Sequence, residues 1–115
     1  MEAADPPIVL IIVLITRWIA VDPQPGIVEC RLTDVWGKEW TFIDKAPIFT
    51  ADGLDERSKY PRPGSIRCTI VRRWRDDSGR EIITVSTQTP DAVEATSGEM
   101  SFDVLPSQLV NFSVR

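Results

Sequence analysis

Five arginines lie close together in the middle of the sequence, and their spacing makes them the first candidates for chemistry. The stretch 67–80 contains these five and only two acidic residues, although the 115-residue chain has a formal net charge of −4. A guanidinium group binds carboxylates and phosphates through paired hydrogen bonds, and Trp74 lies within the same stretch. The stretch could therefore contact an acidic protein surface, or nucleic-acid phosphates with a base stacked on the indole.

The direction in which these arginines point depends on how the stretch turns. A hairpin with a four-residue loop is favoured because it gives one apolar face, made of Cys68, Ile70, Ile83 and Val85. That loop turns four arginines outward together with Val71 and Ile82: Arg67, Arg73, Arg75 and Arg80. Arg72 is then aligned with the core and needs a bulge, a barrel mouth or an acidic partner such as Glu81.

Three interpretations of the outward arginines remain open. They could form a solvated strand face with cross-strand charge pairs, they could bind an acidic protein surface, or they could bind nucleic acid. The sequence pI of about 4.8 means that the chain lacks the broad basic field on which nucleic-acid affinity depends. Asp76 and Asp77, beside the arginines, weaken the third interpretation further.

Paired carboxylates are the remaining residues that could support catalysis. The two adjacent pairs are Asp55-Glu56 and Asp76-Asp77. Adjacent side chains of a strand point to opposite faces, so neither pair makes a natural acid and base. The sequence contains no G-x-S-x-G, Walker, Rossmann or calcium-loop motif. We therefore expect a protein that is not an enzyme.

The chain has no histidine and only two cysteines. Without histidine, imidazole catalysis and histidine-based zinc sites are excluded. Cys30 and Cys68 lie 38 residues apart and are too few for a structural zinc or iron–sulfur site. We expect no cofactor and no metal, and we expect both cysteines to be buried free thiols. A disulfide and a reactive thiol remain the alternatives.

An apolar segment near the start of the chain predicts the first element that would position these residues. Ile8–Ile15 is eight consecutive apolar residues, well short of the roughly 20 that cross a bilayer. Acidic residues precede the run and Arg17-Trp18 follows it, which is unlike a signal peptide. We therefore expect no membrane association and a cytoplasmic protein.

The same segment is rich in isoleucine and valine, which favours a strand. An uninterrupted apolar strand implies burial on both faces or a partner that covers one of them, and on this basis Leu14 is placed in the core. Such a strand is too apolar to be a free edge. Ile8–Ile15 is therefore expected either to be central in the sheet or to pair with the same strand of a second copy in a homodimer.

Two hairpins follow from turn chemistry. The sequence Asp34–Lys38 predicts a three-residue loop with Gly37 in the left-handed conformation. This loop sets Leu32 against Trp40 and Cys30 against Phe42, and it places Trp36 at the tip. The second hairpin is predicted at Asp76–Glu81. This stretch has the same D-x-x-G-[K/R]-E pattern as Asp34–Glu39 in the first hairpin.

The rest of the chain predicts loops and short strands. Ala51–Ser65 is a long polar loop with one helical turn expected from Asp52 to Lys59. Asp91–Thr96 is a candidate short strand, Met100–Val104 alternates like a strand, and Pro106–Val110 is expected to form a helical turn that caps a barrel.

These elements predict an all-β fold. The most favoured architecture is a small, strongly bent antiparallel barrel of five to seven strands, SH3-like or OB-like, and a β-sandwich is the alternative. We expect one domain over residues 1–115, with a disordered leader at 1–7 and the barrel at 8–115.

By elimination, we expect a non-catalytic module that binds another protein, with interaction or inhibitor roles compatible. The proposed binding residues are Arg67, Arg73, Arg75, Arg80 and Trp36. A nucleic-acid-binding barrel that uses the Arg67–Arg80 hairpin is the alternative.

Overall fold

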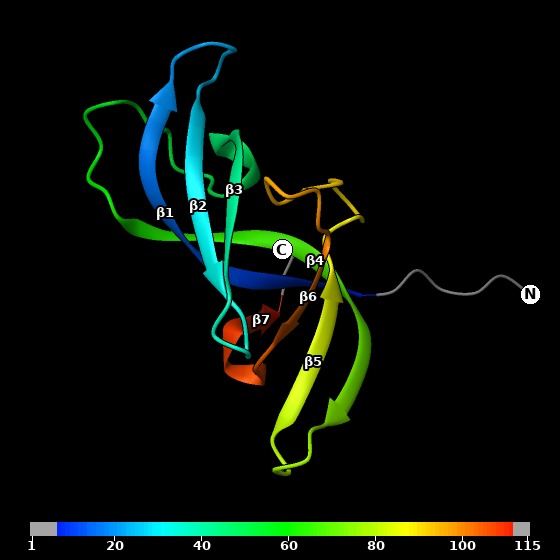
Figure 1. Cartoon of the computed structure of the whole chain (residues 1–115). Coiled ribbons are helices and arrows are strands. Elements are labelled where there is room, and N and C mark those ends of the chain that lie inside the picture. The colour runs from blue at the N-terminus through cyan, green and yellow to red at the C-terminus, as the bar shows by residue number, and fades with distance from the viewer. Residues whose placement is uncertain (1–6, 112–115) are drawn as a thin grey trace, which may run out of the picture.

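The structure, a computed structural model, describes residues 7–111 and consists of seven antiparallel strands with two short 3-10 turns (Figure 1). The strands are β1 (Ile8–Ala20), β2 (Ile27–Thr33), β3 (Glu39–Lys45), β4 (Arg62–Arg75), β5 (Glu81–Ser86), β6 (Ser101–Val104) and β7 (Leu109–Asn111), and the turns are η1 (Ala46–Ile48) and η2 (Pro106–Gln108). The sheet order is β3-β2-β1-β4-β5-β6, and β7 pairs with β1. The sheet curls into a half-barrel, so the expected small, strongly bent all-β fold is confirmed. Of the leader expected at 1–7, all but Pro7 lies outside the described residues.

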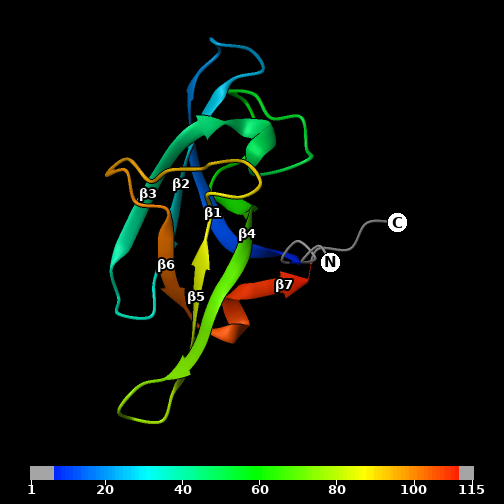
Figure 2. The same ribbon diagram turned by 90° about the vertical axis from the view of Figure 1, so that its right-hand side faces the viewer.

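The long strand β1 is central, as one of the two expectations for the apolar segment required. It pairs with β4 from Ile8 to Ile15, with β2 from Leu14 to Ala20, and with β7 from Val9 to Ile11. One strand thus changes its neighbour part-way along its length. That change of neighbour accompanies the curl of the sheet visible in Figures 1 and 2.

Only one face of β1 is buried, so of the two expectations for this strand, burial on both faces and a partner that covers one, the first is wrong. Val9, Ile11, Val13 and Ile15 line the core, whereas Ile12 is 45% and Leu14 is 44% exposed. Placing Leu14 in the core was therefore wrong. The single curled sheet has only its concave face to fill, so alternate residues of the apolar run point outward.

The half-barrel closes through side chains and isolated hydrogen bonds, because no ladder joins β3 to β6. Phe102 of β6 packs edge-on against Trp40 and Phe42 of β3, with ring centroids 5.2 and 5.5 Å apart. The Val35 amide donates to the Asp103 carbonyl at 2.9 Å, and the Thr96 amide donates to the Thr41 carbonyl at 2.7 Å. The ends of the sheet therefore meet across an aromatic core.

Several local predictions were wrong. The segment Asp91–Thr96 forms no strand, and the expected helical turn at 52–59 is absent from that part of the described chain. Strand β4 begins at Arg62, inside the predicted long loop. The predicted turn after Leu105 is present as η2, but β7 follows it directly and was not predicted. Among the described residues, no helix is both long and apolar enough to cross a membrane.

Candidate functional site

The two hairpin tips that carry the candidate residues have turns with the same hydrogen-bonding pattern. In the first, Asp34 Oδ1 accepts the amides of Trp36 and Lys38, both at 2.9 Å. In the second, Asp76 Oδ1 accepts the amides of Ser78 at 3.0 Å and Arg80 at 2.9 Å. Gly37 and Gly79 have φ of 80° and 83°, a conformation that glycine adopts without steric cost. The predicted pairing of Leu32 with Trp40 and of Cys30 with Phe42 is confirmed.

The second hairpin has a three-residue loop, so the four-residue loop predicted from the apolar pattern was wrong. The Asp76 amide donates to the Arg80 carbonyl at 3.1 Å, and Trp74 lies opposite Ile82. A bulge between Ile70 and Arg72 then shifts the register, so that Ile70 lies opposite Val85, the pairing that a four-residue loop implies. Near the core, β4 and β5 therefore have the register that a four-residue loop would give. At the tip, they have the register of the three-residue loop.

The bulge redistributes the arginines between the two faces of the hairpin. Arg72 lies opposite Thr84, and Trp74 opposite Ile82, on one face. Arg73 and Arg75 lie on the other face. Arg72 is therefore exposed and not aligned with the core, and Ile82, expected to point outward, is fully buried.

Two tryptophans from different hairpins meet on the outside of the half-barrel. Trp36 at the β2–β3 tip and Trp74 of β4 have ring centroids 6.2 Å apart and an interplanar angle of 37°. Trp36 is 53% exposed, and Trp74 is half-buried. The expected position of Trp36 at an exposed loop tip is confirmed.

A small hydrogen-bond network holds both indoles. The Trp36 Nε1–H donates to Asp103 Oδ2 at 3.0 Å, and the Trp74 Nε1–H donates to Thr84 Oγ1 at 3.0 Å. The Thr84 hydroxyl in turn donates to Asp103 Oδ1 at 2.6 Å. Because their only polar donors are already satisfied, the two rings present apolar and π surface to the outside.

An arginine lies over each ring. The Arg72 guanidinium carbon lies 4.7 Å from the Trp74 centroid, and that of Arg80 lies 5.6 Å from the Trp36 centroid. Both distances are within the range of cation–π attraction. We call Trp36, Arg72, Trp74 and Arg80 the tryptophan–arginine surface.

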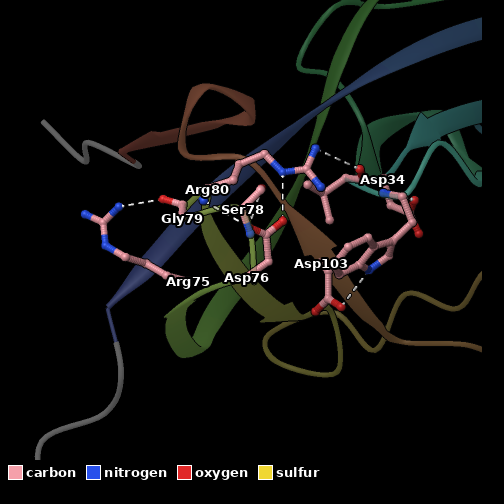
Figure 3. Close-up of polar contacts among 9 residues, drawn as sticks. Asp34, Arg75, Asp76, Ser78, Gly79, Arg80 and Asp103 are labelled. Atoms are coloured by element: carbon pink, nitrogen blue, oxygen red, sulfur yellow. Dashed lines mark hydrogen bonds and ion pairs between the residues drawn. The ribbon is translucent and has the colours of Figure 1, made fainter.

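Asp76 positions Arg80 within this surface. Its carboxylate accepts from the Ser78 hydroxyl at 2.7 Å and from Arg80 Nε at 3.1 Å (Figure 3). These bonds, led by the one from the Ser78 side chain, lower the pKa of Asp76 to about 2. The carboxylate thus stays charged at neutral pH and fixes the guanidinium beside the first hairpin.

A shallow groove of about 380 Å³ runs along the surface between the two tips. Its lining consists of Trp36, Trp74, Arg75, Asp76, Asp77 and Ser78. Arg75 reaches back toward the turn and donates from Nη1 to the Gly79 carbonyl at 2.9 Å (Figure 3). The groove could hold one or two side chains of a partner.

Arg67, also predicted as a binding residue, belongs to a different region. Its guanidinium makes two hydrogen bonds to Asp91, at 2.9 and 2.6 Å. The bond to Asp91 raises the pKa of Arg67. The pair borders a separate groove of about 530 Å³ beside η1, whose walls include Leu10, Pro47 and Ile48. Thus Arg75, Arg80 and Trp36 gather at the hairpin tips, with Arg73 on the same hairpin, whereas Arg67 does not join them.

The cysteines do not contribute to this site. Cys30 and Cys68 are fully buried free thiols, as expected. Burial raises the pKa of each to about 12. In residues 7–111, no group of three or more histidine, cysteine, aspartate or glutamate side chains is arranged to hold a metal ion.

Sequence reasoning missed three contributors to the site. Arg72 was assigned to the core, although the matching turn pattern at Asp34 and Asp76 already favoured the three-residue loop that exposes it. Thr84 bonds Trp74 within the second hairpin, and Asp103 meets Trp36 only through the curl of the sheet, for which the sequence has no local signal. Asp103 is 67 residues away from Trp36 along the chain.

No protein-family model, no curated protein and no solved structure matches this chain.

Proposed function

We propose that this domain is a non-catalytic protein-binding module of the interaction or inhibitor type, and that the tryptophan–arginine surface is its contact site. The observation that carries the proposal is the pair of indoles, 6.2 Å apart, that two separate hairpins bring together. Tryptophan and arginine are the residues most enriched among those that dominate protein–protein binding energy.

The rigidity of the surface supports the proposal. Each indole N–H is bonded inside the domain, and Asp76 holds Arg80. Side chains that are already ordered lose little conformational entropy when a partner binds, so more of the contact energy appears as affinity. An exposed, pre-ordered aromatic pair is a typical anchor for a partner side chain.

Local charge favours a protein partner over nucleic acid. The four arginines of the hairpin, at 72, 73, 75 and 80, stand near four carboxylates, at 76, 77, 81 and 103. The site is therefore close to neutral and the whole chain is acidic, whereas nucleic-acid binding depends on neutralising many phosphates. Binding through this surface should consequently fall less steeply with salt than the binding of a protein that neutralises many phosphates.

Capture from a lysate of the source organism tests the proposal. We expect specific proteins to bind the immobilised native domain, with or without nuclease, and to be lost when Trp36→Ala and Trp74→Ala are combined. Arg72→Glu, an exposed single change, should weaken the same capture. Ile43→Ala is the matched control, since Ile43 is 44% exposed but lies on β3.

Melting temperatures of all variants must show that they are folded. If the double tryptophan variant captured the same proteins as the native domain while folded, the surface would not be the contact site. If capture disappeared on nuclease treatment, the nucleic-acid alternative would replace the proposal.

Self-association through β1 is a second proposal, supported by a different observation. Ile12, Leu14 and Val110 are 45%, 44% and 47% exposed, and all three point away from the core. Association would bury this apolar strip between two copies. Sedimentation at micromolar concentration should show a dimer that Leu14→Asp disrupts, and a 12.9 kDa species alone would refute it.

The proposal includes a cytoplasmic location. Reduced Cys30 and Cys68 fit a reducing compartment, where unpaired thiols persist. Fractionation of the source cells tests this.

A further inference from the structure

The β4–β5 hairpin projects beyond the body of the half-barrel, and part of β4 there borders only one strand. Strand β4 pairs with β1 from Arg62 to Thr69 and with β5 from Thr69 to Arg75. Within residues 7–111, the other edge of Ile70–Arg75 therefore has no strand beside it. In Figure 1 the lower part of β4 runs alongside β5 alone.

An open edge presents backbone N–H and C=O groups that can pair with a further strand. Extended peptides bind to many domains in this way, through main-chain hydrogen bonds with alternate side chains giving specificity. The edge at Ile70–Arg75 lies directly beside the tryptophan–arginine surface, because Arg72 and Trp74 belong to both. A strand added here would extend the sheet next to the exposed indoles.

The charges along this edge select the kind of strand that fits. Arg72 and Arg73 form no ion pair with any residue in the described part of the chain, and Arg75 bonds to a carbonyl rather than a carboxylate. Two of the four nearby carboxylates are engaged elsewhere: Asp76 pairs with Arg80, and Asp103 accepts from Trp36 and Thr84. Glu81 lies opposite Arg75, but within residues 7–111 its carboxylate forms no ion pair.

A second copy of the same edge is disfavoured, because pairing would bring like-charged arginines together. Charged residues on an edge strand prevent self-pairing for this reason. A segment with carboxylates is attracted instead. Because Arg73 and Arg75 share one face and Trp74 lies on the other, the complementary strand alternates acidic residues with apolar ones.

From these observations we infer that the free edge of β4 at Ile70–Arg75 receives an extended acidic segment of the partner, which adds a strand to the sheet. The segment carries carboxylates beside Arg73 and Arg75, and an apolar side chain beside Trp74. The inference rests on the proposed function and specifies its partner: an extended acidic–apolar segment instead of a folded surface.

A synthetic hexapeptide that alternates glutamate and valine, blocked at both ends, is the probe. We expect it to shift the amide NMR signals of 70–75 in the full chain and to slow their hydrogen exchange. The peptide with lysine in place of glutamate should not bind. N-methylation of alternate peptide amides, which removes the donors facing β4, should weaken binding about tenfold or more, or roughly 1.4 kcal/mol.

Two charge-reversal variants of the domain complete the experiment. Arg73→Glu should weaken peptide binding about tenfold or more, whereas Arg57→Glu should not change it. Arg57 is the matched control because it is exposed in the long loop and its side chain makes no hydrogen bond within residues 7–111. The melting temperature of each variant shows that it is folded.

The outcomes separate this inference from the proposed function. If the N-methylated peptide binds as well as the parent, or if only the indole signals move, no strand is added and the inference fails while the tryptophan–arginine surface stands. If a short oligothymidylate displaces the peptide and binds more tightly, nucleic acid is the occupant and the inference is overturned. If the peptide binds only after removal of residues 1–6, the chain's own acidic leader occupies the edge and the separate partner is refuted.

Discussion

Hydrogen bonds within the domain determine which atoms of each side chain at this site stay exposed. The indoles of Trp36 and Trp74 donate inward to Asp103 and Thr84, so their exposed atoms are carbon. The Asp76 carboxylate accepts four hydrogen bonds, two from backbone amides and two from the side chains of Ser78 and Arg80. The polar groups of this site therefore fix the positions of the indole rings and of Arg80. The exposed faces of the rings and the guanidinium groups are left free to contact a partner.

The thiols give a prediction at the same scale. Burial raises the pKa of Cys30 and Cys68 to about 12 from an ordinary 9.0. Because the thiolate is the reactive form, neither should react with an aromatic disulfide reagent at pH 8 while the domain is folded. Their contribution to stability is complete below pH 9 and falls as pH rises from about 9 toward 12, since the unfolded chain loses these protons first.

Absorbance assays with and without urea check this prediction. Ser97→Cys supplies an exposed thiol in the same domain as a control, and it should react at once. Reaction of either native cysteine at the control's rate under folding conditions would contradict the buried positions.

Among the elements, the turn of the second hairpin gives a prediction about pH. Asp76 has its pKa lowered to about 2 from 3.8, chiefly by the Ser78 hydroxyl. A group whose pKa is lowered by folding stabilises the fold above its unfolded value, and that stabilisation is lost as pH falls through the folded value. The advantage of the native domain over Asp76→Asn should therefore shrink between about pH 4 and pH 2.

Melting curves and the NMR signals of residues 76–80 measure this change. Asp77→Asn is the control, since it removes the same charge from the next residue and the Asp77 side chain accepts no hydrogen bond within residues 7–111. An equal response of both variants across this range would refute the assigned role of Asp76.

Strand β1 gives a second prediction for the elements. Leu14 is 44% exposed and Ile15 is fully buried, although they are neighbours in one apolar run. Leu14→Asp should therefore change the free energy of unfolding of the monomer by about 1 kcal/mol or less. Ile15→Asp should cost several kcal/mol, a large fraction of the roughly 5–15 kcal/mol that holds a small domain together. Urea denaturation compares the two, and the reverse order of effects would show that the face assignment is wrong.

The turn residues and the alternation of apolar residues predicted a hairpin correctly only where both signals agreed on one register. The first hairpin followed from Asp34, Gly37 and the apolar pairs, and its register is confirmed. The second failed because a bulge at Val71 allows a short loop and the apolar pairing of Ile70 with Val85 to coexist. A bulge inserts one residue without a distinctive sequence signal, so the turn pattern, which favoured the short loop, and the apolar pattern, which favoured the long one, could not be reconciled from the sequence.

At the scale of the whole molecule, the curvature of the sheet brings the residues of the site together. Both hairpin tips point toward the same end of the half-barrel (Figures 1 and 2), and this alone brings Trp36 to Trp74. The all-β class and the strong bend could be predicted from strand number and turns. Contacts between the two ends of the sheet could not, because they depend on how far the sheet curls.

The closure of the half-barrel gives the last prediction. Phe102 is 2% exposed and packs against Trp40 and Phe42, whereas the hydrogen bonds that cross the gap in the described part of the chain are isolated ones. Phe102→Ala should cost about 3–5 kcal/mol, the usual range for removing a buried aromatic side chain. Phe102→Leu, a milder change, should leave the domain folded but speed exchange of the Val35 and Thr96 amides ahead of the β1–β4 ladder. Since Val35 precedes Trp36, the same variant should also broaden the Trp36 indole signal and weaken partner capture. Closure amides that stayed as protected as the ladder in Phe102→Leu would show that the two ends of the sheet are held together by something other than this aromatic cluster.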